Sequence, residues 1–200
     1  MRRMLVLAGL LLASQTCAAL APAKFNKVVE IGQKAPDWTE LAGVDGKQHS
    51  LKDYAQAKVL VVVFLANHCP VASVYEQRLV EFAGKYQPQD VQLVAVCASQ
   101  SEADTLPRMQ ERAKAGKFNF PYLHDPSQKS ARELGAFVTP HVFVFDAQRK
   151  LAYMGAFDDA NIAANVERHY VRDAVAALLA GMPVETTESR PRGCAIDYAE

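Results

Sequence analysis

The longest run of apolar side chains occupies residues 59–66, and it predicts a strand buried on both faces of a sheet. A polar pair, a cysteine and a proline follow at 67–70. Apolar residues then recur at helical spacing through residue 86, which predicts an amphipathic helix. Cys69 therefore lies at a strand-to-helix junction. Pro70 takes the first helical position, where its missing N–H costs nothing.

The remaining apolar and polar positions predict that strands and helices alternate along the chain. Strands are expected at residues 24–31, 91–97, 120–124, 141–146 and 150–155, helices at 106–115, 127–134 and 168–180, and a hairpin that turns at 45–46. The order around Cys69 is β-α-β-α-β-β-α. It indicates an α/β fold whose central mixed sheet is flanked by helices, with the N-terminal hairpin as an extension.

The first residues have the layout of a signal peptide. Arg2 and Arg3 precede an apolar stretch at 5–13, and small residues follow up to Ala19. We therefore expect a cleaved segment at 1–19 and export to the periplasm or the medium. The apolar stretch is too short to cross a bilayer comfortably, so no membrane span is expected in the mature form. Residues 24–182 would form the domain, followed by a tail at 183–200.

Composition narrows the possible functions. Half of the residues are hydrophobic, enough for a substantial core, and 22 basic residues balance 22 acidic ones, which argues against a nucleic-acid partner. There are four cysteines, and Cys17 would leave with the signal peptide. The remaining Cys69, Cys97 and Cys194 are an odd number, which in an exported protein indicates a free or reactive thiol.

Cys69 is the predicted nucleophile. The free N–H groups at a helix start and the positive end of the helix dipole favour a thiolate there. Cys97 instead ends the apolar strand at 91–97, so core packing is the better interpretation for that thiol.

Three motifs together resemble the redoxin branch of the thioredoxin superfamily, the alkyl hydroperoxide reductase/thiol-specific antioxidant type. They are Gly-x-x-Ala-Pro-Asp-Trp at 32–38, Phe-Leu-Ala-Asn-His-Cys-Pro at 64–70 and Thr-Pro at 139–140. The resemblance covers residues 28–180. With a C-terminal Gly-Cys at 193–194, the chain is similar to the peroxiredoxin-like thioredoxin-family proteins. The resemblance implies a thioredoxin-like fold and an antioxidant oxidoreductase that needs no cofactor.

The chain departs from the active sites of these relatives. Aligned with the Cys-Gly-Pro-Cys motif of thioredoxin, Cys69 matches the nucleophilic cysteine and Ala72 takes the place of the second cysteine. Val63 stands where thioredoxin has a buried acid. In peroxiredoxins the peroxidatic cysteine matches Ala72, and the threonine three residues earlier matches Cys69. These differences favour thiol exchange over peroxidase chemistry.

Two segments are candidates to complete the site. The resemblance implies a cis peptide bond before Pro140, so that Pro70, Thr139 and Pro140 would position an extended substrate. The tail is polar and proline-bearing, which is typical of a disordered end. Its Gly-Cys-Ala-Ile at 193–196 is nevertheless a small apolar anchor. We therefore hypothesise that the tail folds back and that Cys194 resolves Cys69, although connectivity does not follow from sequence.

Two histidines flank the candidate site, His68 before Cys69 and His141 after Pro140. They are either solvent-facing or functional. As modulating residues they would help to hold Cys69 as a thiolate. Alternatively, Cys69, His68 and His141 would form a copper(I) or zinc site.

The sequence predicts an exported thiol–disulfide oxidoreductase that uses Cys69. Its substrate would be a protein or small-molecule disulfide or a peroxide, and an external thiol would be the reductant. The alternatives are a metal-binding redoxin module and a non-catalytic scaffold that kept the fold.

Overall fold

The computed structural model describes residues 23–200, so the predicted signal peptide at 1–19, with Cys17, lies outside the described residues. Nine strands, four α-helices and four short 3₁₀ helices lie within this part of the chain. They are β1 (Leu41–Gly43), β2 (Gln48–His49), η1 (Leu51–Tyr54), β3 (Val59–Phe64), α1 (Pro70–Tyr86), η2 (Gln87–Gln89), β4 (Val91–Cys97), η3 (Glu102–Asp104), α2 (Leu106–Ala115), β5 (Tyr122–His124), α3 (Lys129–Leu134), β6 (Val138–Thr139), β7 (His141–Phe145), β8 (Leu151–Gly155), η4 (Ala163–Asn165), α4 (Tyr170–Leu179) and β9 (Cys194–Ala195).

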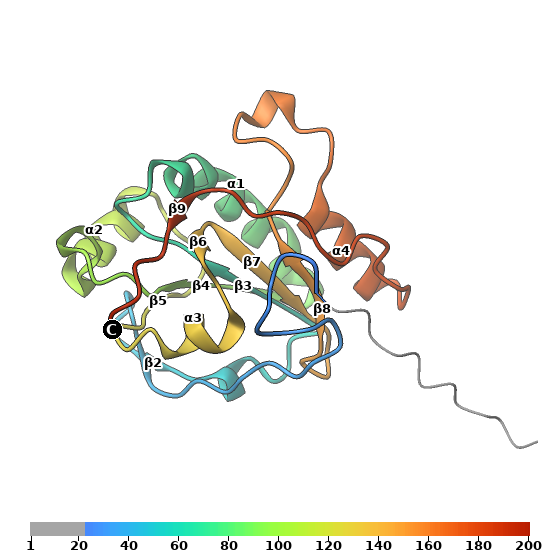
Figure 1. Cartoon of the computed structure of the whole chain (residues 1–200), viewed down its shortest axis with the longest axis horizontal. Coiled ribbons are helices and arrows are strands. Elements are labelled where there is room, and N and C mark those ends of the chain that lie inside the picture. Colours follow the sequence, from blue (N-terminus) through green and yellow to red (C-terminus); the bar gives the residue numbers. More distant parts are fainter. Residues whose placement is uncertain (1–22) are drawn as a thin grey trace, which may run out of the picture.

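Seven strands form one mixed sheet in the order β2-β1-β5-β4-β3-β7-β8 (Figure 1). β3, β4 and β5 are parallel neighbours, whereas β7 pairs antiparallel with both β3 and β8. Parallel neighbours require crossover connections, and α1 and α2 lie in the two crossovers. The predicted thioredoxin-like α/β architecture, a mixed sheet flanked by helices, is confirmed.

Strand β3 is the centre of the core, because all six of its residues are buried. Its alternate side chains divide between two apolar clusters, as the period of two in a strand requires. Val59, Val61 and Val63 pack with side chains of α1 and α4. Leu60, Val62 and Phe64 pack with α3 and with the segment before β1. Both faces of the sheet are therefore covered, which explains the unbroken apolar run.

The N-terminal hairpin is confirmed and extends the sheet. β1 and β2 pair antiparallel around the predicted turn, where Gly46 takes a φ of +79°. β1 also pairs antiparallel with β5, which attaches the hairpin to the sheet edge.

The predicted strand at 24–31 is wrong, because this segment contains no strand. The side-chain oxygen of Asn26 accepts from the amides of Val28 at 2.8 Å and Val29 at 3.3 Å. Such local bonds satisfy the backbone without a neighbouring strand. Within residues 23–200, none of the helices has the length and apolar character needed to cross a membrane.

The tail at 183–200 is folded back onto the domain, as hypothesised, and it is not the disordered end that its polar composition is typical of. β9 pairs antiparallel with β6, with Thr139 opposite Cys194 and Val138 opposite Ala195. The amide of Ile196 then donates to the carbonyl of Phe137 at 3.0 Å. In Figure 1 the tail, coloured red, runs from α4 across the molecule beside α1 and β6. These bonds hold the tail against the segment that precedes Pro140.

Gly193 makes this close approach possible. A Cβ atom at this position would lie 1.9 Å from the carbonyl oxygen of Thr139. We therefore expect Gly193→Ala to release the tail, because overpacking of this kind costs about 1–3 kcal/mol. Amide hydrogen exchange should accelerate roughly tenfold or more in β6 and β9 but not in β3, and trypsin should cut faster after Arg192.

Gly84→Ala is the matched control, because a Cβ atom there meets only the Asn119 side chain at 3.4 Å and the position is helical. Equal exchange in β9 for both variants would contradict the requirement for Gly193.

Candidate functional site

Cys69 is the N-cap residue of α1, as the sequence predicts. Its sulfur accepts a hydrogen bond from the amide of Ala72 at 3.3 Å, in the first turn of the helix. The thiol donates to the carbonyl of Thr139 at 3.0 Å. The residue is completely buried. The sulfur therefore lies between the helix start and the segment that ends at Pro140.

The peptide bond between Thr139 and Pro140 is cis, which confirms the expectation. β6 ends at Thr139 and β7 begins at His141, so Pro140 separates the two strands. The carbonyl of Thr139 faces the thiol of Cys69, and its backbone pairs with Cys194.

The folded tail brings the second thiol to the first. Cys194 is half-buried, and its thiol donates a hydrogen bond to the sulfur of Cys69. The amide of Val71, in the first turn of α1, donates to the sulfur of Cys194. Cys69 has an alanine, Ala72, where thioredoxin has its second cysteine. In this chain the tail supplies the second thiol, Cys194.

The two thiols differ in acidity. Burial raises the pKa of Cys69, but hydrogen bonds from the Cys194 thiol and from backbone amides outweigh it, so the pKa lies below its ordinary value. Burial, followed by the neighbouring Cys69, raises the pKa of Cys194. Cys69 is therefore the thiol that ionises first, while Cys194 keeps its proton.

His68 is held by a carboxylate that the sequence did not reveal. Asp104 is completely buried, and its carboxylate accepts from the ring Nδ1 of His68. It also accepts from the amides of Asn67 at 2.5 Å and His68 at 3.4 Å. Asp104 follows β4 as His68 follows β3, so both lie at the same edge of the sheet. The position of both residues after parallel strands was the signal in the sequence that could have predicted their contact.

His68 lines a cavity of about 410 Å³. Residues 99–101, Thr139 and the tail at 195–199 form its other walls. The tail therefore closes a pocket beside the cysteine pair.

His141 lies away from the thiols. It is 1% exposed and its ring contacts Phe137 and Phe143, on the sheet face opposite the one that α1 covers. Burial lowers its pKa to about 3. Across residues 23–200, no three His, Cys, Asp or Glu side chains are grouped so that they would hold a metal ion. The structure therefore does not bring Cys69, His68 and His141 together as the alternative metal site would require.

Cys97 packs in the core, as predicted. It is completely buried at the end of β4, and burial raises the pKa of its thiol to about 12. This thiol is therefore protonated at neutral pH.

Known proteins share both the sequence and the fold of this chain. Residues 31–154 match the AhpC/TSA family. A hypothetical protein from Sinorhizobium meliloti 1021 is 34% identical, with a TM-score of 0.79 over 86% of this chain and 96% of that chain. An uncharacterized conserved protein from Geobacillus kaustophilus is 32% identical, with a TM-score of 0.81 over 90% and 97% of the two chains.

A thioredoxin family thiol:disulfide interchange protein from Chlorobium tepidum TLS shares the fold at 19% identity. Its TM-score is 0.58 over 74% of this chain and 97% of that chain. No curated protein matches this sequence. The family match covers more than half of the chain, in the region that carries Cys69 and the cis Pro140. The chain therefore belongs to the AhpC/TSA family, with a thioredoxin-like fold.

Proposed function

We propose that this protein is a thiol–disulfide oxidoreductase whose redox pair is Cys69 and Cys194. One observation carries the proposal: the pairing of β9 with β6 sets Cys194 opposite Thr139, whose carbonyl lies 3.0 Å from the sulfur of Cys69. The lowered pKa of Cys69 and the raised pKa of Cys194 agree with it. A nucleophilic thiol needs a lowered pKa, and a resolving thiol needs to lie within reach of it.

The chemistry begins with the Cys69 thiolate. It attacks one sulfur of a substrate disulfide, a mixed disulfide forms, and the other substrate sulfur leaves as a thiolate that takes up a proton. Cys194 then loses its proton and attacks the Cys69 sulfur, which releases the second substrate thiol and leaves a Cys69–Cys194 disulfide. Two equivalents of an external thiol restore the two cysteines.

A peroxide is the other substrate that the redox pair would accept. The Cys69 thiolate would then become a sulfenic acid, and Cys194 would displace water from it. Disulfide exchange is favoured, because Ala72 stands in the peroxidatic position and Cys69 takes the place of the peroxidase threonine.

The substrate would bind where Pro70, Thr139 and Pro140 surround the thiol. Because the backbone of Thr139 is paired with Cys194 and Cys69 is buried, an extended substrate replaces the tail strand as it binds. His68 is the proposed modulating residue. Its Nδ1 is held by Asp104 and the residue lines the adjacent cavity, where its ring would hydrogen-bond a bound substrate.

We also propose that the protein is exported to the periplasm or the medium and that it functions without a cofactor. The support is the signal-peptide pattern at 1–19 and the chemistry of two thiols, which needs only a substrate and a thiol reductant. Its partners would thus be a disulfide or peroxide substrate and an external thiol.

Substitution of each cysteine tests this assignment. We expect Cys69→Ser to reduce disulfide-reductase activity to the rate without protein. Cys194→Ser should accumulate a mixed disulfide at position 69, because resolution is blocked. Cys97→Ser is the control and should retain turnover. The measurements are a disulfide-reduction assay and mass mapping of the oxidised mature protein. Full activity in Cys69→Ser, or an oxidised protein with Cys194 free, would exclude the mechanism and favour a non-catalytic scaffold.

The acidity of Cys69 should depend on its neighbour. In Cys194→Ala the thiol donor is lost, so the pKa of Cys69 should rise, and each unit of rise lowers the thiolate fraction at neutral pH about tenfold. Cys194→Ser keeps a hydroxyl donor and should cause a smaller rise. Titration of thiolate ultraviolet absorbance measures both variants. Identical curves for wild type and Cys194→Ala would show that the hydrogen bond between the thiols does not set the pKa.

Asp104→Asn tests the support of His68. We expect about tenfold slower mixed-disulfide formation, because the ring loses its fixed orientation, and no further loss when His68→Gln is added. Asp125→Asn is the matched control: Asp125 is 1% exposed and bonds Ser127 and Ser130 instead. Both variants should lower the free energy of unfolding by about 1–3 kcal/mol. Equal effects on the rate would assign Asp104 a structural role only.

A further inference from the structure

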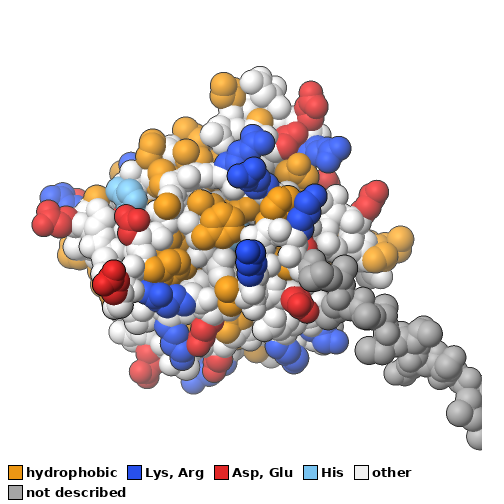
Figure 2. Space-filling model, in the orientation of Figure 1, with side chains coloured by type: hydrophobic (Ala, Val, Ile, Leu, Met, Phe, Trp, Pro, Cys, Tyr) orange, Lys and Arg blue, Asp and Glu red, His pale blue; other side chains and the backbone are white. Residues whose placement is uncertain are grey.

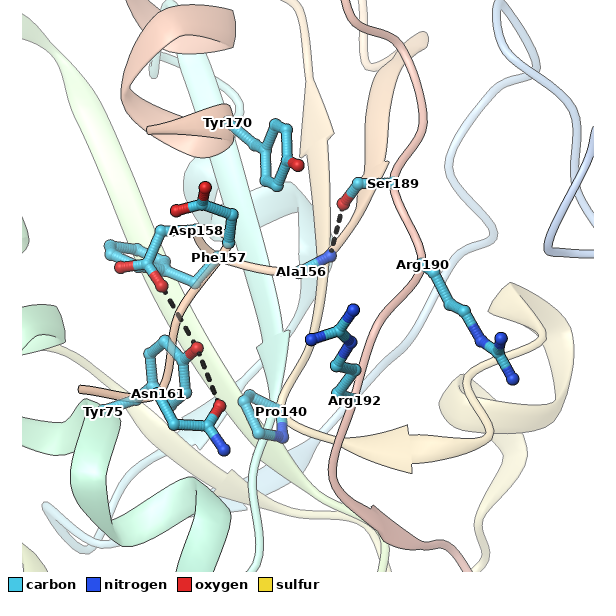
Figure 3. A pocket seen from close by; sticks show the side chains of 11 residues that line it. Tyr75, Pro140, Ala156, Phe157, Asp158, Asn161, Tyr170, Ser189, Arg190 and Arg192 are labelled. Carbon is cyan, nitrogen blue, oxygen red and sulfur yellow. Dashed lines mark hydrogen bonds between the residues drawn. The ribbon is translucent and has the colours of Figure 1, made fainter. Parts of the chain in front are cut away.

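A second cavity, of about 130 Å³, lies on the other side of Pro140 (Figure 3). Its apolar wall is made by Pro140 and Phe157, and its polar wall includes Tyr75, Asn161 and Tyr170. The tail, which carries the redox-active Cys194 of the proposed function, forms the remaining side. This volume is slightly smaller than a cavity of about 150 Å³ that binds benzene, so it encloses roughly six non-hydrogen atoms of a ligand that extends towards solvent.

The cavity is close to the cysteine pair. Pro140 directly follows Thr139, whose carbonyl contacts the thiol of Cys69. Tyr75 lies one helical turn, about 5.4 Å, beyond Val71, whose amide bonds the sulfur of Cys194. Arg192, which also lines the cavity, is only two residues before Cys194 in the tail, so the cavity borders the segment that carries the second thiol.

The cavity is lined by charges of both signs. Arg192 belongs to no ion pair or side-chain hydrogen bond among residues 23–200. Figure 3 shows its guanidinium beside Pro140 and Ala156, whereas the side chain of Arg190 points away from the other labelled residues. The carboxylates of Asp158 and Asp159 also line the cavity.

The carboxylates of Asp158 and Asp159 differ in the number and kind of partners that they already bind. Asp158 is buried and bonded to Arg78 at 2.7 Å and to the hydroxyl of Tyr75 at 3.1 Å. Asp159 accepts only from the amides of Glu167 and Arg168, each at 3.0 Å, and it is half-buried. Asp159 therefore keeps lone pairs for a cation, and Arg192 keeps its donors for a carboxylate.

We propose that this cavity binds a zwitterionic amino-acid thiol of the size of free cysteine, as the reductant of the Cys69–Cys194 disulfide. Arg192 would hold the α-carboxylate, Asp159 the α-ammonium group, and Pro140 and Phe157 would contact the methylene carbon. The inference rests on the proposed function and names the chemical class of its reductant.

The reaction balances with two equivalents of this thiol. The first thiolate attacks the sulfur of Cys194, which is the more exposed, and the bond to Cys69 breaks. Cys69 leaves as a thiolate, the better leaving group because its pKa is the lower of the two. A second thiolate then attacks the ligand sulfur of the mixed disulfide. The products are the small disulfide and Cys194, which takes up a proton.

The test compares three small thiols on the oxidised full-length mature protein at equal thiolate concentrations. They are cysteine, cysteamine, which lacks the carboxylate, and 3-mercaptopropionate, which lacks the ammonium group. We expect saturable reduction by cysteine, with a second-order rate constant about tenfold or more above that of either analogue. Serine, which has no thiol, should compete with cysteine. Quenched free-thiol counting gives the rates. Equal rate constants for the three thiols would overturn the proposal.

Arg192→Gln and Arg190→Gln form the matched pair of variants. The first should lower the rate with cysteine about tenfold and leave the rate with cysteamine unchanged, while the second should change neither. Equal losses in the two variants would overturn the role of Arg192. Dithiothreitol separates the two proposals. If dithiothreitol reduces the Cys69–Cys194 disulfide but cysteine reduces it no faster than its two analogues do, only the cavity assignment fails. If that disulfide never forms, the proposed function itself fails.

Discussion

The short antiparallel pairing between β6 and β9 is the interaction on which the site depends. It sets Cys194 opposite Thr139, and the carbonyl of Thr139 contacts the thiol of Cys69. Cys69 begins the helix that follows the first core strand, and Cys194 lies near the end of the chain. Backbone hydrogen bonds between distant segments therefore bring together two thiols that the local sequence keeps apart. They supply the partner that Ala72 cannot.

The environment of Cys69 is a balance of opposing effects. Complete burial works against a thiolate, since an apolar surrounding penalises charge. The start of α1 works in its favour, through the amide of Ala72 and the helix dipole. The thiol of Cys194 adds a further donor, and the pKa of Cys69 falls below its ordinary value. The helix start and the docked tail thus both lower the pKa of this buried thiol.

The tail also shapes the surroundings of the redox pair. It forms one wall of the cavity beside His68 and one wall of the cavity beside Pro140. The two cavities differ in chemistry, since one is bordered by a histidine held by a buried carboxylate and the other by Arg192 and two aspartates. A segment outside the matched family region therefore controls both the second thiol and the pockets that border it.

The sequence by itself determined what depends on local patterns. The apolar run at 59–66 identified the central strand, because a strand covered on both faces cannot alternate. Pro70 fixed the helix start and so the environment of Cys69. The Thr-Pro motif at 139–140 indicated the cis bond by family resemblance.

Only the tertiary structure decided what depends on contacts between distant segments. The face of the sheet on which His141 lies follows from the register of β7 against β3, which placed it away from the cysteine. The role of Asp104 follows from two strand ends that meet at one edge. The docking of Cys194 needs the close approach of Gly193 to Thr139. Hydrophobic periodicity reports how a segment folds, but which segments meet depends on packing across the whole domain.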